Sequence, residues 1–149
     1  MCRKQTLLIF LGFFLLSPAF LSAQTAAQLE AVLETQTVSC AQAAEFILAA
    51  SGTASPQTGF EQAMANRWFC KGTTPDESIT LGKLSFLMMK AFGIKGGLLY
   101  TIFPGPRYAF RSMVSRSYIP GSSDPAMKVS GERFLLILGR VLNAVGEEL

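Results

Sequence analysis

The sequence contains no histidine among its 149 residues. Histidine is the usual general base of serine and cysteine hydrolases and a frequent zinc ligand, because its imidazole titrates near neutral pH. The absence excludes Ser-His-Asp and Cys-His catalytic sites and histidine-ligated zinc. It favours a protein that binds a partner over one that catalyses a reaction.

Aspartate is scarce too, and the only two in the chain are Asp76 and Asp124. They occupy matching positions in two turn-rich loops, which is typical of Asx-turns and not of the paired carboxylates of hydrolases. Alignment of these loops on the EF-hand places Lys83 and Arg133 at the position of the bidentate glutamate, where a cation would repel Ca²⁺. The sequence therefore predicts a non-enzymatic protein with no cofactor or metal site.

The first 23 residues have the three-part layout of a secretory signal peptide. A basic start at Arg3 and Lys4 precedes an apolar run over residues 7–16, and the segment ends in a small residue, Ala23. The alternative is an uncleaved membrane anchor, but a spanning helix needs about 20 apolar residues, and this run is shorter. We expect cleavage after Ala23 and export to the periplasm or the cell surface, with no membrane span in the mature chain.

Residues 24–149, the expected mature chain, contain 11 lysines and arginines against 10 acidic residues, a net charge of +1. Nucleic acids and anionic membrane surfaces attract proteins through a large basic excess. The charge balance therefore predicts no nucleic-acid partner and gives no support to an anionic membrane as partner.

The mature chain keeps two cysteines, Cys40 and Cys70. In an oxidising compartment they could form one disulfide bridge. They could equally remain as thiols that act as small hydrophobic residues. Spacing along the chain does not decide between the two, because a bridge requires the two sites to lie within bonding distance.

One short pattern occurs three times: an aliphatic residue, then a serine or threonine, then an amphipathic helix. The three copies begin at Val38-Ser39, Ile79-Thr80 and Val129-Ser130. The hydroxyl residue stands where a helix N-cap belongs, so its oxygen can accept a hydrogen bond from a free backbone N–H of the first turn. Gln42, three residues after Ser39, completes the pattern of a capping box.

Each copy is preceded by a second apolar stripe with helical spacing. One pair of helices cannot enclose a core, but three pairs packed together can. We therefore expect an all-α fold, a small bundle of three helix-loop-helix pairs that forms one domain over residues 24–149. The pairs cover about residues 25–52, 59–93 and 106–143.

This threefold pattern resembles the S-layer homology (SLH) repeat of bacterial envelope proteins. The best matching stretches are residues 68–92 and 118–142, and residues 26–51 match with a shortened loop. The resemblance implies a pseudo-threefold bundle that attaches proteins to cell-wall polysaccharide. The signature of the repeat reads roughly Ile-Thr-Arg-Ala-Glu, and its arginine helps to bind the anionic polymer. In this chain the arginine position holds Cys40, Leu81 and Gly131.

The longest link between the expected pairs contains an apolar run, residues 98–103, followed by a proline-glycine turn. Two interpretations stay open: residues 98–108 fill the core, or they form a partner-docking surface. In the second interpretation Arg107, Tyr108 and Arg111 contact the partner. Arginine and tyrosine favour such contacts and can also hydrogen-bond to sugars and stack on them.

These features predict an exported envelope protein that binds a cell-wall polysaccharide or another envelope protein. The alternative is a periplasmic assembly factor or chaperone-like helper that holds client proteins on the apolar run of residues 98–103.

Overall fold

The structure is a computed structural model that describes residues 19–120 and 123–147, with side chains from residue 26 onward. The chain divides into two units, Met1–Ala31 and Val32–Leu149. The expected signal peptide falls mainly on residues 1–18, which lie outside the described residues.

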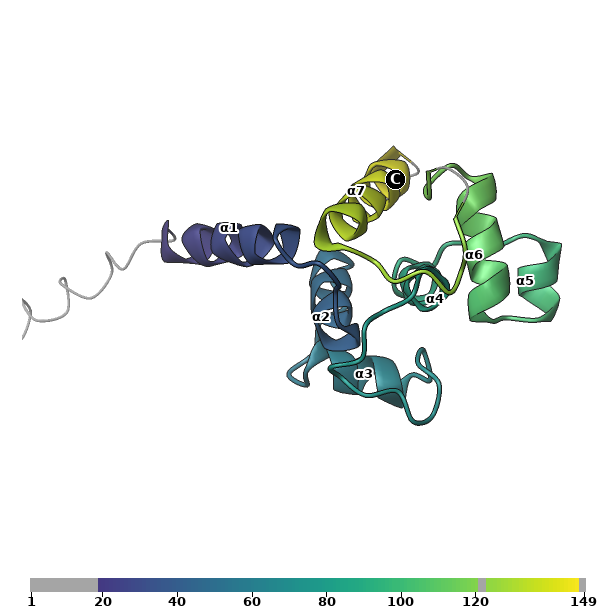
Figure 1. Cartoon of the computed structure of the whole chain (residues 1–149), viewed down its shortest axis with the longest axis horizontal. Coiled ribbons are helices and arrows are strands. Elements are labelled where there is room, and N and C mark those ends of the chain that lie inside the picture. Colours follow the sequence, from purple (N-terminus) through teal and green to yellow (C-terminus); the bar gives the residue numbers. More distant parts are fainter. Residues whose placement is uncertain (1–18, 121–122, 148–149) are drawn as a thin grey trace, which may run out of the picture. The chain divides into compact units, whose positions relative to one another are not determined.

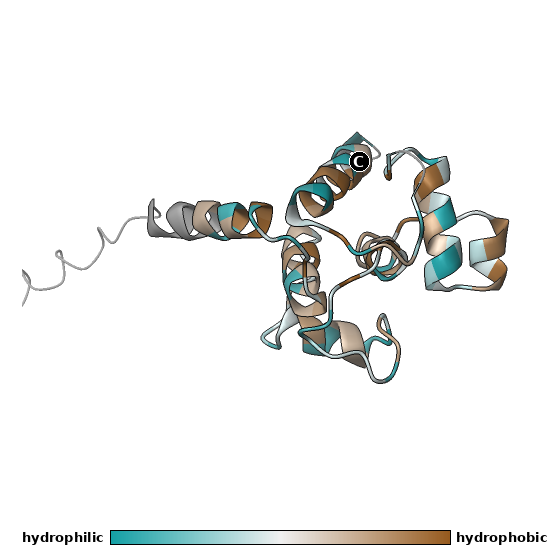
Figure 2. Cartoon of the chain, in the orientation of Figure 1, coloured by the Kyte–Doolittle hydropathy of each residue, from teal (hydrophilic) through white to brown (hydrophobic). Residues whose placement is uncertain are grey.

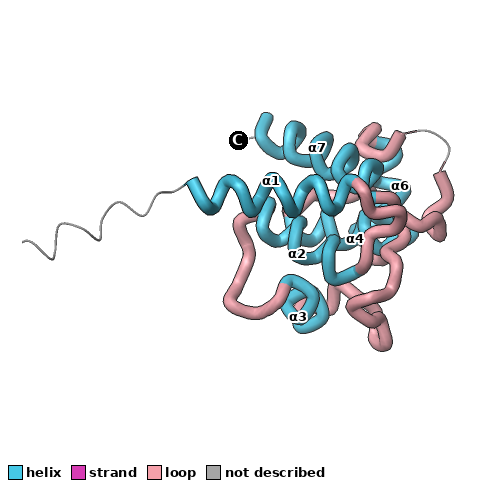
Figure 3. The backbone as a smooth tube through the Cα atoms, turned by 60° about the vertical axis from the view of Figure 1, so that its left-hand side comes forward, coloured by secondary structure: helices cyan, strands magenta, loops and turns pink. Residues whose placement is uncertain are grey.

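Within the described residues the chain is helical and has no β-strand, which confirms the all-α prediction (Figures 1 and 3). The seven helices are α1 (Ala19–Leu33), α2 (Cys40–Ala50), α3 (Gly59–Ala65), α4 (Leu81–Ala91), α5 (Leu98–Ile102), α6 (Pro106–Ser115) and α7 (Gly131–Glu147). The helix α3 ends at Ala65, and the φ of 58° at Arg67 shows that the backbone has left the helical conformation there. The short helix α5 was not expected; it forms within the apolar run.

The three predicted N-caps are confirmed. The hydroxyl of Ser39 accepts from the N–H of Gln42 at 3.2 Å, and the Gln42 side chain completes the capping box. Thr80 caps α4 through the N–H of Lys83 at 3.4 Å, and Ser130 caps α7 through the N–H of Arg133 at 3.4 Å. Each cap fixes where a helix begins, because it satisfies an N–H that has no partner inside the helix.

The residues just before these caps are joined to one another by backbone hydrogen bonds. Val38 N–H donates to Val129 at 2.8 Å, Val129 N–H donates to Ile79 at 3.2 Å, and Ile79 N–H donates to Val38 at 2.8 Å. The three bonds close a ring, and none of the three side chains has exposed surface. The ring joins the starts of α2, α4 and α7 in the buried interior of the second unit.

The core of the described residues lies wholly between Val32 and Val141. Residues 24–149 therefore contain every core residue of the part of the chain that the structure describes. The most extensive helix contacts in this unit join α2 to α3 and α4 to α6, and smaller ones join α2 to α4 and α5 to α6. The second expected pair consists of α3 and α4, and the third of α6 and α7. The two most extensive contacts, α2 with α3 and α4 with α6, therefore join helices that belong to successive pairs.

Candidate functional site

An open groove of about 620 Å³ lies beside α4 and α6, and we call it the α4–α6 groove. Four segments form its walls: the loop at Cys70, the start of α4, the first half of α6 and the loop before Val129. The residues that line it are Cys70, Thr80, Gly82, Lys83, Pro106, Arg107, Phe110, Arg111, Asp124, Pro125 and Ala126.

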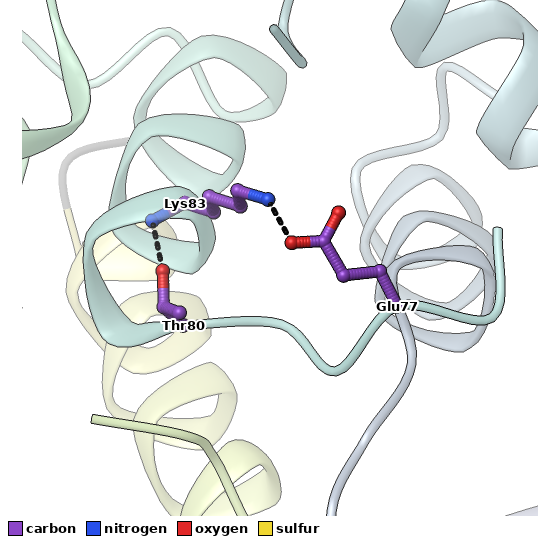
Figure 4. Close-up of polar contacts among 3 residues, drawn as sticks. All are labelled: Glu77, Thr80 and Lys83. Carbon is purple, nitrogen blue, oxygen red and sulfur yellow. Dashed lines mark hydrogen bonds and ion pairs between the residues drawn. The ribbon is translucent and has the colours of Figure 1, made fainter. Parts of the chain in front are cut away.

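One of the groove's cations, Lys83, already has a partner. Its ammonium group contacts the carboxylate of Glu77 at 2.6 Å, while its backbone N–H is capped by Thr80 (Figure 4). The hydrogen bond from Lys83 lowers the pKa of Glu77 below its ordinary value. Because Glu77 balances its charge, Lys83 is a weak candidate for binding an anion.

Arg107 and Arg111 lie four residues apart on α6 and therefore project from the same face of the helix. Both side chains are exposed, and neither forms an ion pair within the described residues. The nearly buried ring of Phe110 lies between them in sequence and also lines the groove. The arrangement offers two free guanidinium groups beside an apolar floor.

The backbone at the start of α4 is not free to bind an anion. The N–H of Leu81 donates to Met127 at 2.9 Å, and the N–H of Gly82 donates to Pro125 at 2.8 Å. Asp124 stabilises this loop by accepting from the N–H of Ala126 at 2.7 Å, which confirms its predicted Asx-turn. Recognition of an anion in the groove must therefore come from side chains, chiefly the two arginines.

The third predicted binding residue, Tyr108, does not line this groove. Its half-buried ring lies 6.4 Å from the ring of Phe103, measured between centroids. It lines a smaller depression of about 280 Å³ between α5 and α6, which also includes Leu98, Leu99 and Arg111. The structure thus brings Arg107 and Arg111 together in one groove and places Tyr108 with Arg111 in the other depression.

The two cysteines are unbridged in the structure and differ in exposure. Cys40 is completely buried, whereas Cys70 is exposed and lines the α4–α6 groove. Burial raises the pKa of the Cys40 thiol to about 11, an effect that the charge of Lys83 partly offsets. A thiol that stays protonated is a poor nucleophile, so Cys40 acts as a small core residue.

Residues 98–103 form an exposed surface and not core. Leu98, Leu99, Ile102 and Phe103 are all exposed, and only Tyr100 of this run is buried. Sequence reasoning left this question open, because an apolar run is compatible with either environment.

Sequence reasoning missed the residues that other segments bring to the α4–α6 groove, chiefly Lys83 and Pro125. No sequence signal joins them, since their proximity depends on the hydrogen bonds between the loop before Val129 and the start of α4. The described residues hold no group of three or more cysteine or acidic side chains that could bind a metal ion.

Compared with known proteins, the chain matches no family model, no curated protein and no solved structure. Among the described residues, no helix combines the length and the apolar character needed to cross a membrane.

Proposed function

We propose that the processed chain is an exported, non-enzymatic module of the cell envelope that binds an anionic wall polysaccharide in the α4–α6 groove. The observation that carries the proposal is the pair of exposed, unpaired guanidinium groups of Arg107 and Arg111 beside Phe110. Guanidinium groups form paired hydrogen bonds with carboxylates and phosphates, and an apolar floor accepts the flat face of a sugar ring.

The arrangement of the helix starts supports the proposal of an SLH-like fold. Three capped segments with the same aliphatic-hydroxyl pattern are joined in one closed ring of hydrogen bonds. The arginine of the SLH signature is absent from all three segments. In this proposal Arg107 and Arg111 of α6 supply the positive charge instead, so the polymer is bound from a neighbouring helix.

Export and the lack of catalytic chemistry complete the proposal. The leader pattern of residues 1–23 supports export, and the absence of histidine from the sequence leaves no imidazole base. A protein of this kind stays at the cell wall through the polysaccharide that it binds, and it can hold a bound partner there.

The test is co-sedimentation of residues 24–149 with purified wall polysaccharide, comparing the wild type with the double variant Arg107→Ala and Arg111→Ala. We expect the double variant to bind at least about tenfold more weakly, because two charge-assisted contacts are lost. Its melting temperature should not change, since both side chains are exposed. Binding of the wild type should also weaken at about 0.5 M NaCl, where the Debye length falls below about 5 Å.

A matched control removes two exposed cations outside the groove, through Arg67→Asn and Lys128→Gln. Asparagine is chosen at Arg67 because it tolerates the positive φ of that position. The control should bind like the wild type. Equal binding by the control and by the arginine double variant, or no binding by the wild type, would refute the proposal.

A further inference from the structure

The helix α5 and the residue that follows it present four large apolar side chains to solvent. Leu98 is 76%, Leu99 49%, Ile102 56% and Phe103 61% exposed, and we call these four residues the α5 patch. Figure 2 shows α5 coloured mostly as hydrophobic. Four exposed apolar side chains within six residues are typical of a site of interaction.

One residue anchors this helix to the rest of the unit. The buried ring of Tyr100 lies 6.3 Å from the ring of Phe86 on α4, measured between centroids, in an edge-to-face arrangement. The Lys90 ammonium group lies 6.0 Å from the centroid of the Tyr100 ring. Tyr100 thus fixes α5 by its inner side, while the α5 patch faces outward.

The charged residues of the segment that carries the α5 patch are all basic. Residues 78–123 contain six basic side chains and no acidic one, whereas residues 24–77 contain six acidic and two basic side chains. The net charge of +1 for the mature chain is therefore a sum that includes an acidic segment, residues 24–77, and a basic one, residues 78–123. The six basic residues are Lys83, Lys90, Lys95, Arg107, Arg111 and Arg116.

Several of these cations lie close to the α5 patch. Lys90 contacts the ring of Tyr100, and Arg111 lines the same depression as Leu98 and Leu99. Lys95 is exposed, and its carbonyl oxygen accepts a 2.6 Å hydrogen bond from the exposed Arg116. A partner that covers the patch would therefore meet positive charge on its border.

We propose that the α5 patch inserts into the interface of an anionic lipid bilayer, with the neighbouring cations contacting lipid phosphates. Interfacial segments place apolar side chains about 5–10 Å deep at the boundary of headgroups and acyl chains, with basic residues at headgroup level. A five-residue helix is about 7.5 Å long, which is compatible with a position at the interface and too short to span a bilayer. The same charge pattern disfavours a neutral apolar protein groove, which offers no partner for the cations.

The test is flotation of residues 24–149 with vesicles of phosphatidylcholine, with and without about 30 mol% phosphatidylglycerol. Residues 24–149 contain every core residue that the structure describes. They lack the apolar leader of residues 1–23, which would bind lipid by itself. We expect binding to the anionic vesicles only. The variant Leu98→Ser with Phe103→Ser should weaken it at least about tenfold, because two large apolar side chains no longer enter the interface.

Two further variants separate the contributions. Lys95→Gln should weaken binding to anionic vesicles about fivefold, the usual contribution of one cation near an anionic surface. The control Leu29→Ser with Leu136→Ser removes two leucines of 43% and 47% exposure outside the patch and should leave binding unchanged. Circular dichroism of each variant confirms that it is folded.

Absence of wild-type binding to anionic vesicles would overturn the proposal, as would equal binding by Leu98→Ser with Phe103→Ser. If the patch instead suppressed aggregation of an unfolded client protein and bound no vesicle, its occupant would be protein and not lipid. These variants leave Arg107 and Arg111 intact, so failure here is distinguishable from failure of polymer binding in the α4–α6 groove.

Discussion

The N–H of Ile79 donates a 2.8 Å hydrogen bond to the carbonyl oxygen of Val38, and both side chains are completely buried. This bond is one side of the closed ring that joins the starts of α2, α4 and α7. Because the ring is buried, its backbone groups have no access to water, and loss of its packing would leave them without compensation.

The first prediction concerns the packing of this ring. We expect Ile79→Ala to lower the free energy of unfolding by about 2–5 kcal/mol, since it creates a cavity where three segments meet. Urea unfolding followed by circular dichroism measures the change. The control Val114→Ala truncates an exposed side chain and should change stability by less than about 0.5 kcal/mol. Similar values for the two variants would contradict the central role of the ring.

The second prediction concerns Gly131 at the start of α7. A Cβ atom at this position would clash with the carbonyl oxygen of Val32, so the backbone would have to move. We expect Gly131→Ala to destabilise the protein by at least about 2 kcal/mol.

Gly139 in the same helix provides the control, because a Cβ atom there meets nothing within 4 Å. Gly139→Ala should be neutral or stabilise the protein by up to about 1 kcal/mol, as expected for a helix interior. Thermal unfolding of the two variants tests the contrast, and a harmless Gly131→Ala would show that the close approach to Val32 does not exist.

The third prediction concerns the thiols. In the native processed chain we expect one thiol to react rapidly with a disulfide reagent, that of the exposed Cys70, while the buried Cys40 stays protected. Both should react after unfolding in guanidinium. The variant Cys70→Ser should abolish the fast reaction. A native chain without any reactive thiol, in which reduction releases two, would instead show a Cys40–Cys70 bridge.

The fourth prediction concerns alkaline pH. Burial raises the pKa of Cys40 from 9.0 to about 11, so the native state keeps its proton where the unfolded state loses it. The resulting stabilisation is complete below pH 9 and is lost as the pH rises to about 11. Relative to Cys40→Ala, the wild type should lose about 2 kcal/mol over this window. Parallel stability curves for the two proteins between these pH values would contradict the prediction.

The fifth prediction concerns acidic pH. The hydrogen bond from Lys83 lowers the pKa of Glu77, so any stabilisation is present above the ordinary value of 4.5 and is lost as the pH falls through the lower native value. The wild type should be slightly more stable than Glu77→Gln at neutral pH and equal to it in strong acid. Urea midpoints at the two pH values provide the measurement. A stability difference that persists in strong acid would assign the effect of Glu77 to something other than its charge.

Local signals predicted the helix starts well, because each depends on residues close together in sequence. Ser39, Thr80 and Ser130 cap the helices that follow them, since an N-cap needs only a hydroxyl and the next turn of backbone. The α4–α6 groove could not be predicted in this way. Lys83 and Pro125 are 42 positions apart, and backbone hydrogen bonds between their segments bring them together.

The apolar run of residues 98–103 shows what composition predicts and what only the packing of helices decides. Its composition indicates that it avoids water, but a core and a docking surface both satisfy that requirement. The edge-to-face contact of Tyr100 with Phe86 turns one side of α5 inward and leaves Leu98 and Phe103 exposed. That outcome depends on the position of α4, and nothing in the apolar run itself specifies which of its side chains meets Phe86.

The sequence by itself determined the helical class, the positions of the capped helix starts and the absence of imidazole chemistry, because each rests on composition or on contacts within one turn. Only the tertiary structure decided that Val38, Ile79 and Val129 form a closed ring, that Arg107 and Arg111 share a groove while Tyr108 does not, and that the α5 patch is exposed. The physical reason is that packing of distant segments selects which face of each helix is buried, and one sequence pattern is compatible with more than one such arrangement.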